Sequence, residues 1–196
     1  EIDFSADGKS SSFAFFGAGN YASRVLIKSF KSSGVKLHSL VTTSGEGSFY
    51  HGVKNKFKEA TTDAKSVWNN PDIKNVVIAT RHDSHCQLVL EGMACNKNIF
   101  VEKPLCLNKK ELDEITKCFV ETNKEDKRLL MVGFNRRFSP HIKKMKELLN
   151  NKENPKSLIM TVNAGHIPSD HWIHDREVGG GCYDDRERSS NQRRER

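Results

Sequence analysis

The sequence is poor in cysteine and lacks closely spaced cysteine pairs. Its 196 residues include five cysteines and no Cys-x-x-Cys motif: Cys86, Cys95, Cys106, Cys118 and Cys182. An odd number of widely spaced cysteines is a poor basis for a disulfide framework or a zinc site. We therefore expect reduced thiols in a cytoplasmic protein.

Long hydrophobic runs are also missing. Hydrophobic residues make up 36% of the chain, and no stretch has the length and apolarity that a bilayer span requires. The first residues, Glu1 to Phe4, lack both an initiating methionine and the basic-then-apolar layout of a secretory signal. The sequence therefore predicts no membrane role, and we expect it to be an excerpt from a longer chain.

A continuous basic surface is absent despite a formal net charge of +7. The one dense group of arginines lies within residues 184–196, where it is interleaved with Asp184, Asp185, Glu187 and Glu195. Interleaved charges of opposite sign are a poor match for a phosphate backbone. We expect no nucleic-acid partner.

A glycine-rich turn directly follows the first apolar run, Ser12 to Phe16. It reads Gly17-Ala18-Gly19-Asn20-Tyr21-Ala22 and leads into a predicted helix over residues 21–33. The first glycine of such a turn permits the tight bend, and the second lets the backbone approach a pyrophosphate at the helix N-terminus. A glycine turn of some other α/β protein is the alternative, but the flanking strand and helix favour a dinucleotide site.

Apolar runs and helical patterns alternate along the chain. Strands are predicted at residues 12–16, 35–43, 75–79, 98–101 and 129–133, with helices at 21–33, 49–57, 84–96 and 108–122. Residues 44–47 are expected to close the second strand, and residues 70–72 to break the chain. This order predicts an α/β fold, a Rossmann-type doubly wound parallel sheet, followed by the start of a truncated α+β substrate domain.

The domain boundaries follow from these patterns. We expect residues 1–11 to be a linker or the end of a preceding domain, residues 12–135 to form the NAD(P)-binding Rossmann domain, and residues 136–181 a partial substrate domain. The partial domain would contain an amphipathic helix at 140–149 and a strand at 157–162. Residues 182–196 have almost no apolar content and are predicted to be a disordered tail.

Three polar loops follow predicted parallel strands: residues 80–85, residues 102–104 and residues 134–138. Each alone could be an ordinary surface loop. Because ligands of open α/β sheets bind beyond the carboxyl ends of the strands, the three loops together predict a cleft.

These motifs resemble the Gfo/Idh/MocA oxidoreductases, the family of glucose-fructose oxidoreductase and inositol dehydrogenase. The resemblance rests on Gly17-Ala18-Gly19-Asn20, on residues 79–85, on Val101-Glu102-Lys103-Pro104-Leu105 and on residues 132–140, and it covers Ser12 to Gly181. It is similar in particular to the branch in which this unit follows a zinc-dependent alcohol dehydrogenase-like half. On that comparison the chain is truncated at its C-terminal end.

The resemblance implies a role for each matched residue. Lys103 would be catalytic, between nicotinamide and substrate, with a cis bond to Pro104. Thr80, His82 and His85 would line the nicotinamide ribose and pyrophosphate side. The implied cofactor-binding residues are Gly17, Gly19, Asn20, Tyr21, Ser44, Thr80, Arg81, His82, His85, Glu102, Lys103, Pro104, Asn135 and Arg136. The implied substrate-side residues are Arg136, His166, His171 and Trp172.

The cofactor would be NAD or NADP, and the substrate a small sugar, cyclitol or nucleotide-sugar derivative. The acidic residue expected about twenty residues after the glycine turn is not evident at positions 42–44; Glu46 is a late candidate, and Lys54 and Lys56 lie nearby. The choice of dinucleotide therefore stays open. The histidines at 166, 171 and 174 could suggest a metal, but their spacing fits no known ligand set and we expect none.

The sequence departs from the family pattern after Gly181. The helix with a catalytic histidine that the resemblance implies does not follow, and no histidine comes after His174. We therefore expect these residues to be inactive by themselves. The alternative is a non-catalytic dinucleotide-binding or scaffolding module. The parent protein is expected to be a homo-oligomer.

Overall fold

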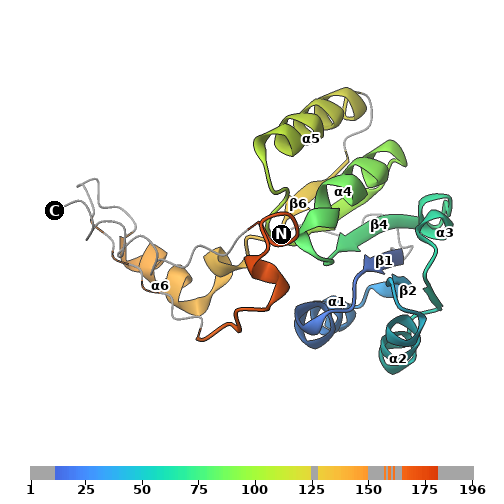
Figure 1. The fold of residues 1–196 in the computed structure, drawn as a ribbon, viewed down its shortest axis with the longest axis horizontal. Coiled ribbons are helices and arrows are strands. Elements are labelled where there is room, and N and C mark those ends of the chain that lie inside the picture. The colour runs from blue at the N-terminus through green and yellow to red at the C-terminus, as the bar shows by residue number, and fades with distance from the viewer. Residues whose placement is uncertain are drawn as a thin grey trace.

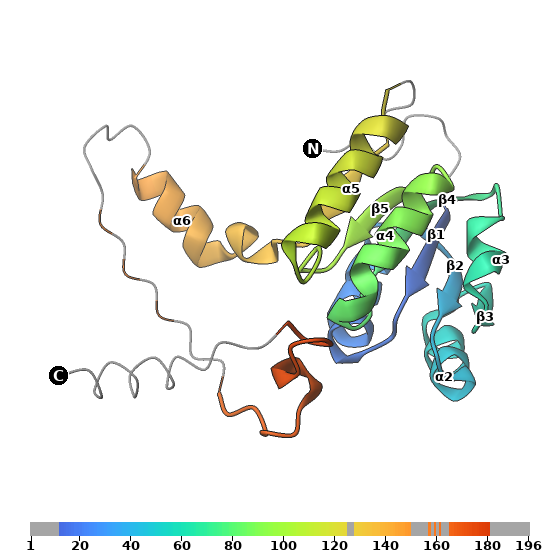
Figure 2. The same ribbon diagram turned by 45° about the horizontal axis from the view of Figure 1, so that its top comes forward.

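The computed structural model describes residues 12–124, 128–149, 157, 159, 161 and 165–180. Its centre is a six-stranded sheet in the order β3-β2-β1-β4-β5-β6, with every neighbouring pair parallel. The strands are β1 (Ser12–Phe16), β2 (Lys36–Val41), β3 (Glu59–Thr61), β4 (Ile73–Ile78), β5 (Asn98–Val101) and β6 (Leu130–Val132). This is the doubly wound order, with its switch point between β1 and β4 (Figures 1 and 2).

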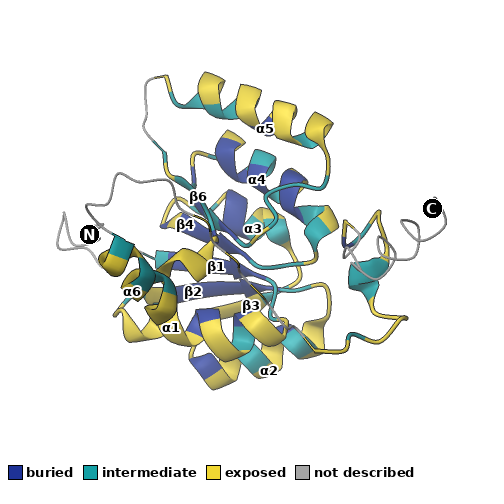
Figure 3. Cartoon of the chain, turned by 90° about the vertical axis from the view of Figure 1, so that its left-hand side faces the viewer, coloured by how far each residue is buried: buried dark blue, intermediate teal, exposed yellow. Residues whose placement is uncertain are grey.

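Helices cover both faces of the sheet (Figure 3). One face carries α1 (Ile27–Ser32) and α2 (Gly45–Asn55), and the other carries α3 (Ala64–Trp68), α4 (His85–Ala94) and α5 (Lys109–Thr122). A short π-helical turn, η1 (Ala22–Leu26), joins the glycine turn to α1. A 3-10 turn, η2 (His82–Ser84), precedes α4.

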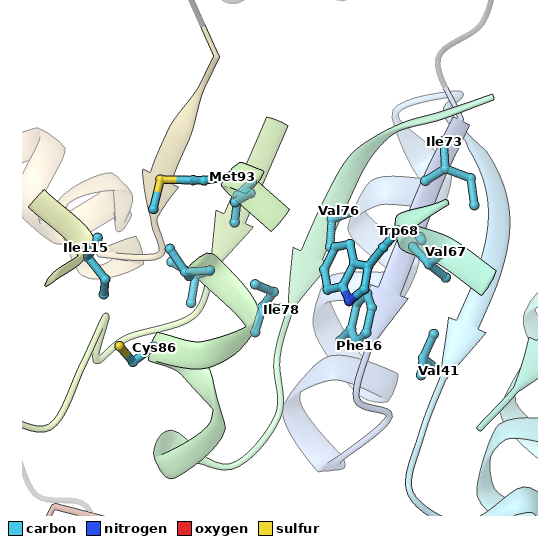
Figure 4. Close-up of a cluster of buried hydrophobic side chains, with 14 residues drawn as sticks. Phe16, Val41, Val67, Trp68, Ile73, Val76, Ile78, Cys86, Met93 and Ile115 are labelled. Carbon is cyan, nitrogen blue, oxygen red and sulfur yellow. The ribbon is translucent and has the colours of Figure 1, made fainter. Parts of the chain in front are cut away.

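Strand β1 separates two apolar cores. Phe13 and Phe15 face α1, where both rings meet Phe30 edge to face. Ala14 and Phe16 face α3 and α4, and Phe16 stacks on Trp68 with ring centroids 4.6 Å apart (Figure 4). Alternate residues of one strand point to opposite faces, so a run that is apolar at every position is buried on both.

The structure corrects two sequence expectations around β2. Residues 45–47 were expected in a turn, but α2 begins at Gly45, because Ser44 takes the extended backbone conformation of an N-cap. Strand β3 was not predicted. It has three residues, with Glu59 and Ala60 exposed, and it pairs only with β2 at the edge of the sheet, so it carries no hydrophobic pattern.

Asn108 and Glu111 cap the first turn of α5. The side chain of Asn108 accepts a hydrogen bond from the Glu111 N–H at 3.0 Å. The Glu111 carboxylate reaches back to the N–H of Leu107, at 2.8 Å, rather than to that of Asn108. Both groups still satisfy donors at the helix start.

Beyond β6 lie the 3-10 turn η3 (Asn135–Phe138), helix α6 (Pro140–Leu149) and the 3-10 turn η4 (Trp172–His174). Helix α6, predicted with the same bounds, extends away from the sheet (Figures 1 and 2). Of the strand expected at 157–162, positions 158, 160 and 162 lie outside the described residues, and positions 157, 159 and 161 are not in a strand. The linker expected at 1–11 and the tail expected at 182–196 lie outside the described residues.

Within the described part of the chain, no helix combines the length and hydrophobicity needed to cross a bilayer.

Candidate active site at the carboxyl edge of the sheet

The loops that carry the sequence motifs lie next to one another along the carboxyl edge of the sheet. Just past the strand ends, Gly17 N–H donates to the Val41 carbonyl at 2.9 Å, and Ala79 N–H donates to the Phe16 carbonyl at 2.8 Å. The same pattern continues with Glu102 N–H to Ile78 and Gly133 N–H to Val101, both at 2.8 Å. These hydrogen bonds place the starts of four loops side by side at the carboxyl edge.

Gly17 can only be glycine in this backbone. Its φ is +95°, and a Cβ at this position would lie 2.4 Å from the carbonyl oxygen of Ala79. The turn after β1 is therefore pressed against the start of the loop after β4. The first glycine of the motif serves the packing of the turn.

Gly19 occupies a different environment. A Cβ at this position would meet no heavy atom within 4 Å. The carbonyl of Gly19 accepts from both the N–H and the hydroxyl of Ser23, at 2.8 and 2.9 Å, which fixes the turn to the start of the following helix. The open space beside Gly19, next to the N-terminus of a helix, fits the diphosphate of a dinucleotide.

The loop after β4 is held by its own side chains. The Ser84 hydroxyl donates to the Thr80 hydroxyl at 2.7 Å and also lies 2.8 Å from the Arg81 carbonyl. Thr80 follows Ala79, so its backbone lies against Gly17. This loop and the glycine turn form the floor of the candidate site.

A segment far along the chain docks on this loop; we call residues 171–180 the strap. The ring Nδ1 of His82 lies 2.9 Å from the Gly179 carbonyl, and Asp83 N–H donates to the Val178 carbonyl at 3.1 Å. The Trp172 ring meets His82 edge to face at 4.9 Å. The strap therefore reaches the same edge of the sheet (Figure 2).

The loop after β5 carries Glu102, Lys103 and Pro104. The Lys103–Pro104 bond is cis, as the resemblance implies. Lys103 is exposed, whereas Oε1 of Glu102 is buried without a hydrogen-bond partner among the described residues. Burial raises the pKa of Glu102, and the backbone N–H and the charge of Lys103 oppose that rise.

Gly133 also borders the candidate site, although it is not among the site residues that the sequence predicts. A Cβ there would lie 2.7 Å from Oε1 of Glu102 and 3.2 Å from the ring of Phe100. Because residue 133 has no side chain, the Glu102 carboxyl can occupy the space beside it. The signal was present in the sequence, as a glycine at the end of the predicted strand 129–133.

His85 is entirely buried, in contrast to the exposed Lys103. Its Nδ1 lies 2.6 Å from the Pro104 carbonyl and its Nε2 lies 3.3 Å from the Thr80 carbonyl. Both ring nitrogens therefore face the protein backbone. Its expected contact with the nicotinamide side stays a prediction, and the contacts that the structure gives are internal.

The loop after β6 reaches the glycine turn. The Asn135 side-chain amide donates to the Tyr21 hydroxyl at 2.6 Å, joining residues 114 positions apart. Arg136 follows in η3 and is exposed. At the end of β2, the Thr42 hydroxyl donates to the Ser44 carbonyl at 2.6 Å. The sequence-predicted residues 17, 19–21, 44, 80–82, 102–104 and 135–136 are therefore all at the carboxyl edge.

The expected substrate-side residues are less closely assembled. Trp172 lies against the loop after β4, with Arg81 5.8 Å from its ring centre. His171 accepts a hydrogen bond from Ile173 N–H at 3.3 Å, and His166 is exposed. Among the described residues, no group of three His, Cys, Asp or Glu side chains is arranged to hold a metal ion.

Comparison with known proteins identifies relatives. Residues 11–134 match the model of an oxidoreductase family with an NAD-binding Rossmann fold, Gfo/Idh/MocA. The chain is 31% identical over 107 residues to myo-inositol 2-dehydrogenase of Thermotoga maritima, a match over 55% of this chain and 31% of the relative. It is 32% identical over 127 residues to the uncharacterised oxidoreductase YrbE of Bacillus subtilis, over 64% of this chain and 35% of the relative. The chain thus spans about a third of the length of these curated relatives.

Solved structures agree in fold. A putative myo-inositol dehydrogenase from Sinorhizobium meliloti superposes with a TM-score of 0.64 and 27% identity, over 71% of this chain and 41% of that one. Levoglucosan dehydrogenase, solved with NADH and levoglucosan, gives a TM-score of 0.67 at 18% identity, over 88% and 49%, a likeness of fold alone. On the family match and these relatives, the chain belongs to the Gfo/Idh/MocA family of oxidoreductases.

Proposed function

We propose that this chain binds NAD or NADP at the carboxyl edge of its sheet, as part of an oxidoreductase acting on a sugar, cyclitol or nucleotide-sugar derivative. The observation that carries the proposal is the open space beside Gly19, set against the fixed turn at Gly17. Relatives named as inositol dehydrogenases support the class of substrate.

The backbone of the glycine turn and the start of η1 would hold the diphosphate. Thr80 and Arg81, on the loop pressed against that turn, would lie along the ribose, and Asn135 would close the opposite side through its contact with Tyr21. The nicotinamide, when bound, supplies the hydride acceptor or donor. The absence of a carboxylate at positions 42–44 leaves room for either dinucleotide.

Lys103 would face the reacting oxygen of the substrate. An ammonium group can donate a hydrogen bond to a carbonyl oxygen or to a hydroxyl. When desolvation lowers its pKa it can release a proton, and the resulting neutral amine can accept one. Glu102 lies next to it with a raised pKa, because its carboxyl is buried beside Gly133. A protonated Glu102 would leave the charge of Lys103 uncompensated and available to the substrate.

We propose further that these 196 residues turn over substrate poorly by themselves. The histidine that the family resemblance places after the triple glycine is not among them, so a proton-transfer group is missing. A purely binding role is the second candidate, and the same missing histidine favours it.

Nicotinamide fluorescence during titration with NADH and NADPH tests the proposal. Saturable binding at submillimolar cofactor is expected, and no saturation at millimolar concentration would refute it. Turnover with a panel of polyols then separates the two candidates. Weak or absent turnover by the binding-competent chain agrees with the missing proton-transfer group, while rapid turnover would show that the group is dispensable.

A further inference from the structure

His85 connects the two loops that would flank the nicotinamide. It is the first residue of α4, and its ring lies between the loop after β4 and the loop after β5. One nitrogen lies 2.6 Å from the carbonyl of Pro104 and the other lies 3.3 Å from the carbonyl of Thr80. The ring is fully buried.

A neutral imidazole cannot donate a hydrogen bond to both carbonyl oxygens, because the ring has a single N–H. Burial, the largest effect, lowers the pKa of His85 and favours the neutral ring. The shorter contact is the better hydrogen bond. The N–H therefore belongs on Nδ1, where it donates to Pro104.

The Pro104 carbonyl is one residue beyond Lys103 and directly follows the cis bond. A donor on that carbonyl fixes where the backbone of Lys103 runs relative to Thr80. We propose that His85 is a positioning residue: its Nδ1–H tautomer holds the loop after β5, which carries Lys103, at a set distance from the loop after β4. The effect on Lys103 and a bound nicotinamide rests on the proposed function, whereas the contacts of His85 with Pro104 and Thr80 do not.

The charged and titratable neighbours of the ring are compatible with this assignment. His82, on the preceding turn, lies 5.7 Å away between ring centroids, and its charge would disfavour protonation of His85. The charge of Asp83 and the two carbonyl contacts act in the opposite direction. Burial exceeds them, so the neutral ring with one N–H is the form to be tested.

The tautomer can be read directly on the whole chain. Long-range proton–nitrogen correlation spectra of the ¹⁵N-labelled protein distinguish a protonated Nδ1 from a protonated Nε2. We expect His85 to give the Nδ1–H pattern at pH 7.5. An Nε2–H pattern, or a doubly protonated ring, would overturn the inference whether or not the chain binds a dinucleotide.

Two substitutions separate the two ring nitrogens. The amide nitrogen of Asn is as many bonds from Cβ as Nδ1, and that of Gln is as many bonds as Nε2. His85→Asn should therefore keep the bond to Pro104, and His85→Gln should lose it. Melting temperature and NADH affinity are measured for both, together with the rate at which acetic anhydride labels Lys103, relative to the exposed Lys109.

The quantity compared is the protection of Lys103, meaning the factor by which bound NADH slows its labelling by acetic anhydride. Protection should be within about twofold of the parent in His85→Asn and reduced about tenfold in His85→Gln, the effect of one lost hydrogen bond. The NADH dissociation constant of each variant is measured in parallel, so that the labelling of Lys103 is compared at the same fraction of NADH-bound chain. Equal protection in the two variants would overturn the inference while leaving the proposed function in place.

Other failures have different signatures. If no form of the chain binds NADH, the proposed function fails and the tautomer spectrum alone decides the inference. If His85→Gln does not fold, the spectrum of the parent again decides it.

Discussion

The Cβ that residue 17 lacks would lie 2.4 Å from the carbonyl oxygen of Ala79. This relationship joins the first strand to the fourth at the switch point of the sheet, where ligands of doubly wound folds bind. Gly19, two residues on, has no neighbour within 4 Å of the same imagined atom. Substitution by alanine is therefore expected to affect the stability of the fold at Gly17 and the binding of a ligand at Gly19.

Gly17→Ala should destabilise the fold. The new methyl group collides with backbone atoms, which cannot rotate away, and alanine is strained at a φ of +95°. We expect a loss of about 2 to 5 kcal/mol in the free energy of unfolding. Urea denaturation measures this directly, and a midpoint equal to that of the parent would show that the turn is not packed as described.

Gly19→Ala should leave the fold intact and weaken dinucleotide binding. Its methyl group projects into open space in the free chain, but it would occupy the approach of a diphosphate to the backbone. We expect a melting temperature close to that of the parent and a cofactor affinity reduced about tenfold or more, since about 1.4 kcal/mol corresponds to tenfold. Calorimetric titration checks the affinity; unchanged binding would place the diphosphate elsewhere.

His85 should make the fold sensitive to acid. Its pKa in the folded chain is below the ordinary 6.5, chiefly because the ring is buried. Below pH 6.5 the unfolded chain takes up a proton that the folded chain does not, so the free energy of unfolding falls as the pH drops from 6.5 to the folded pKa.

The His85→Asn variant isolates this effect, because asparagine does not titrate. The difference in unfolding free energy between parent and variant should be constant above pH 7.5 and should move against the parent below pH 6.5. Urea denaturation at a series of pH values gives that difference. A flat difference from pH 7.5 to pH 5 contradicts the burial of a neutral ring.

Trp172→Ala should loosen the strap without unfolding the sheet. The ring packs on His82 and Arg81, but it belongs to neither apolar core. Amide exchange at Asp83, whose N–H donates to Val178, should speed up about threefold to tenfold, the range expected for loss of one aromatic contact. Trp172→Phe is the matched control and should exchange more slowly than the alanine variant. Equal exchange in all three chains would remove Trp172 as an anchor.

Much of the fold could be predicted because the central strands of the sheet are buried on both faces. Residues 13–16 of β1 are all apolar, and so are most residues of Ile73–Ile78, and both are central strands. Strand β3 could not be predicted, because it is an exposed edge strand of three residues and its sequence shows no run of apolar residues. The start of α2 at Gly45 depends on the backbone of Ser44, which composition does not reveal.

The positions of the site residues divide in the same way. Loops that follow parallel strands must reach one edge, so the placement of Gly17, Thr80 and Glu102 there could be foreseen. The burial of His85 depends on the path of the loop through Pro104, and the docking of Gly179 on His82 joins residues 97 positions apart. Such contacts come from tertiary packing, which one local pattern does not encode.

The central claim is that a dinucleotide binds at the carboxyl edge between the glycine turn and Lys103. Backbone amide shifts of the ¹⁵N-labelled chain, recorded as NAD⁺ or NADP⁺ is added, locate the ligand directly. We predict saturable shifts concentrated at residues 17–22, 80–84 and 102–104, with residues 109–122 of α5 unaffected. Shifts confined to α5 or another distant element, or no shifts at millimolar cofactor, would contradict the account.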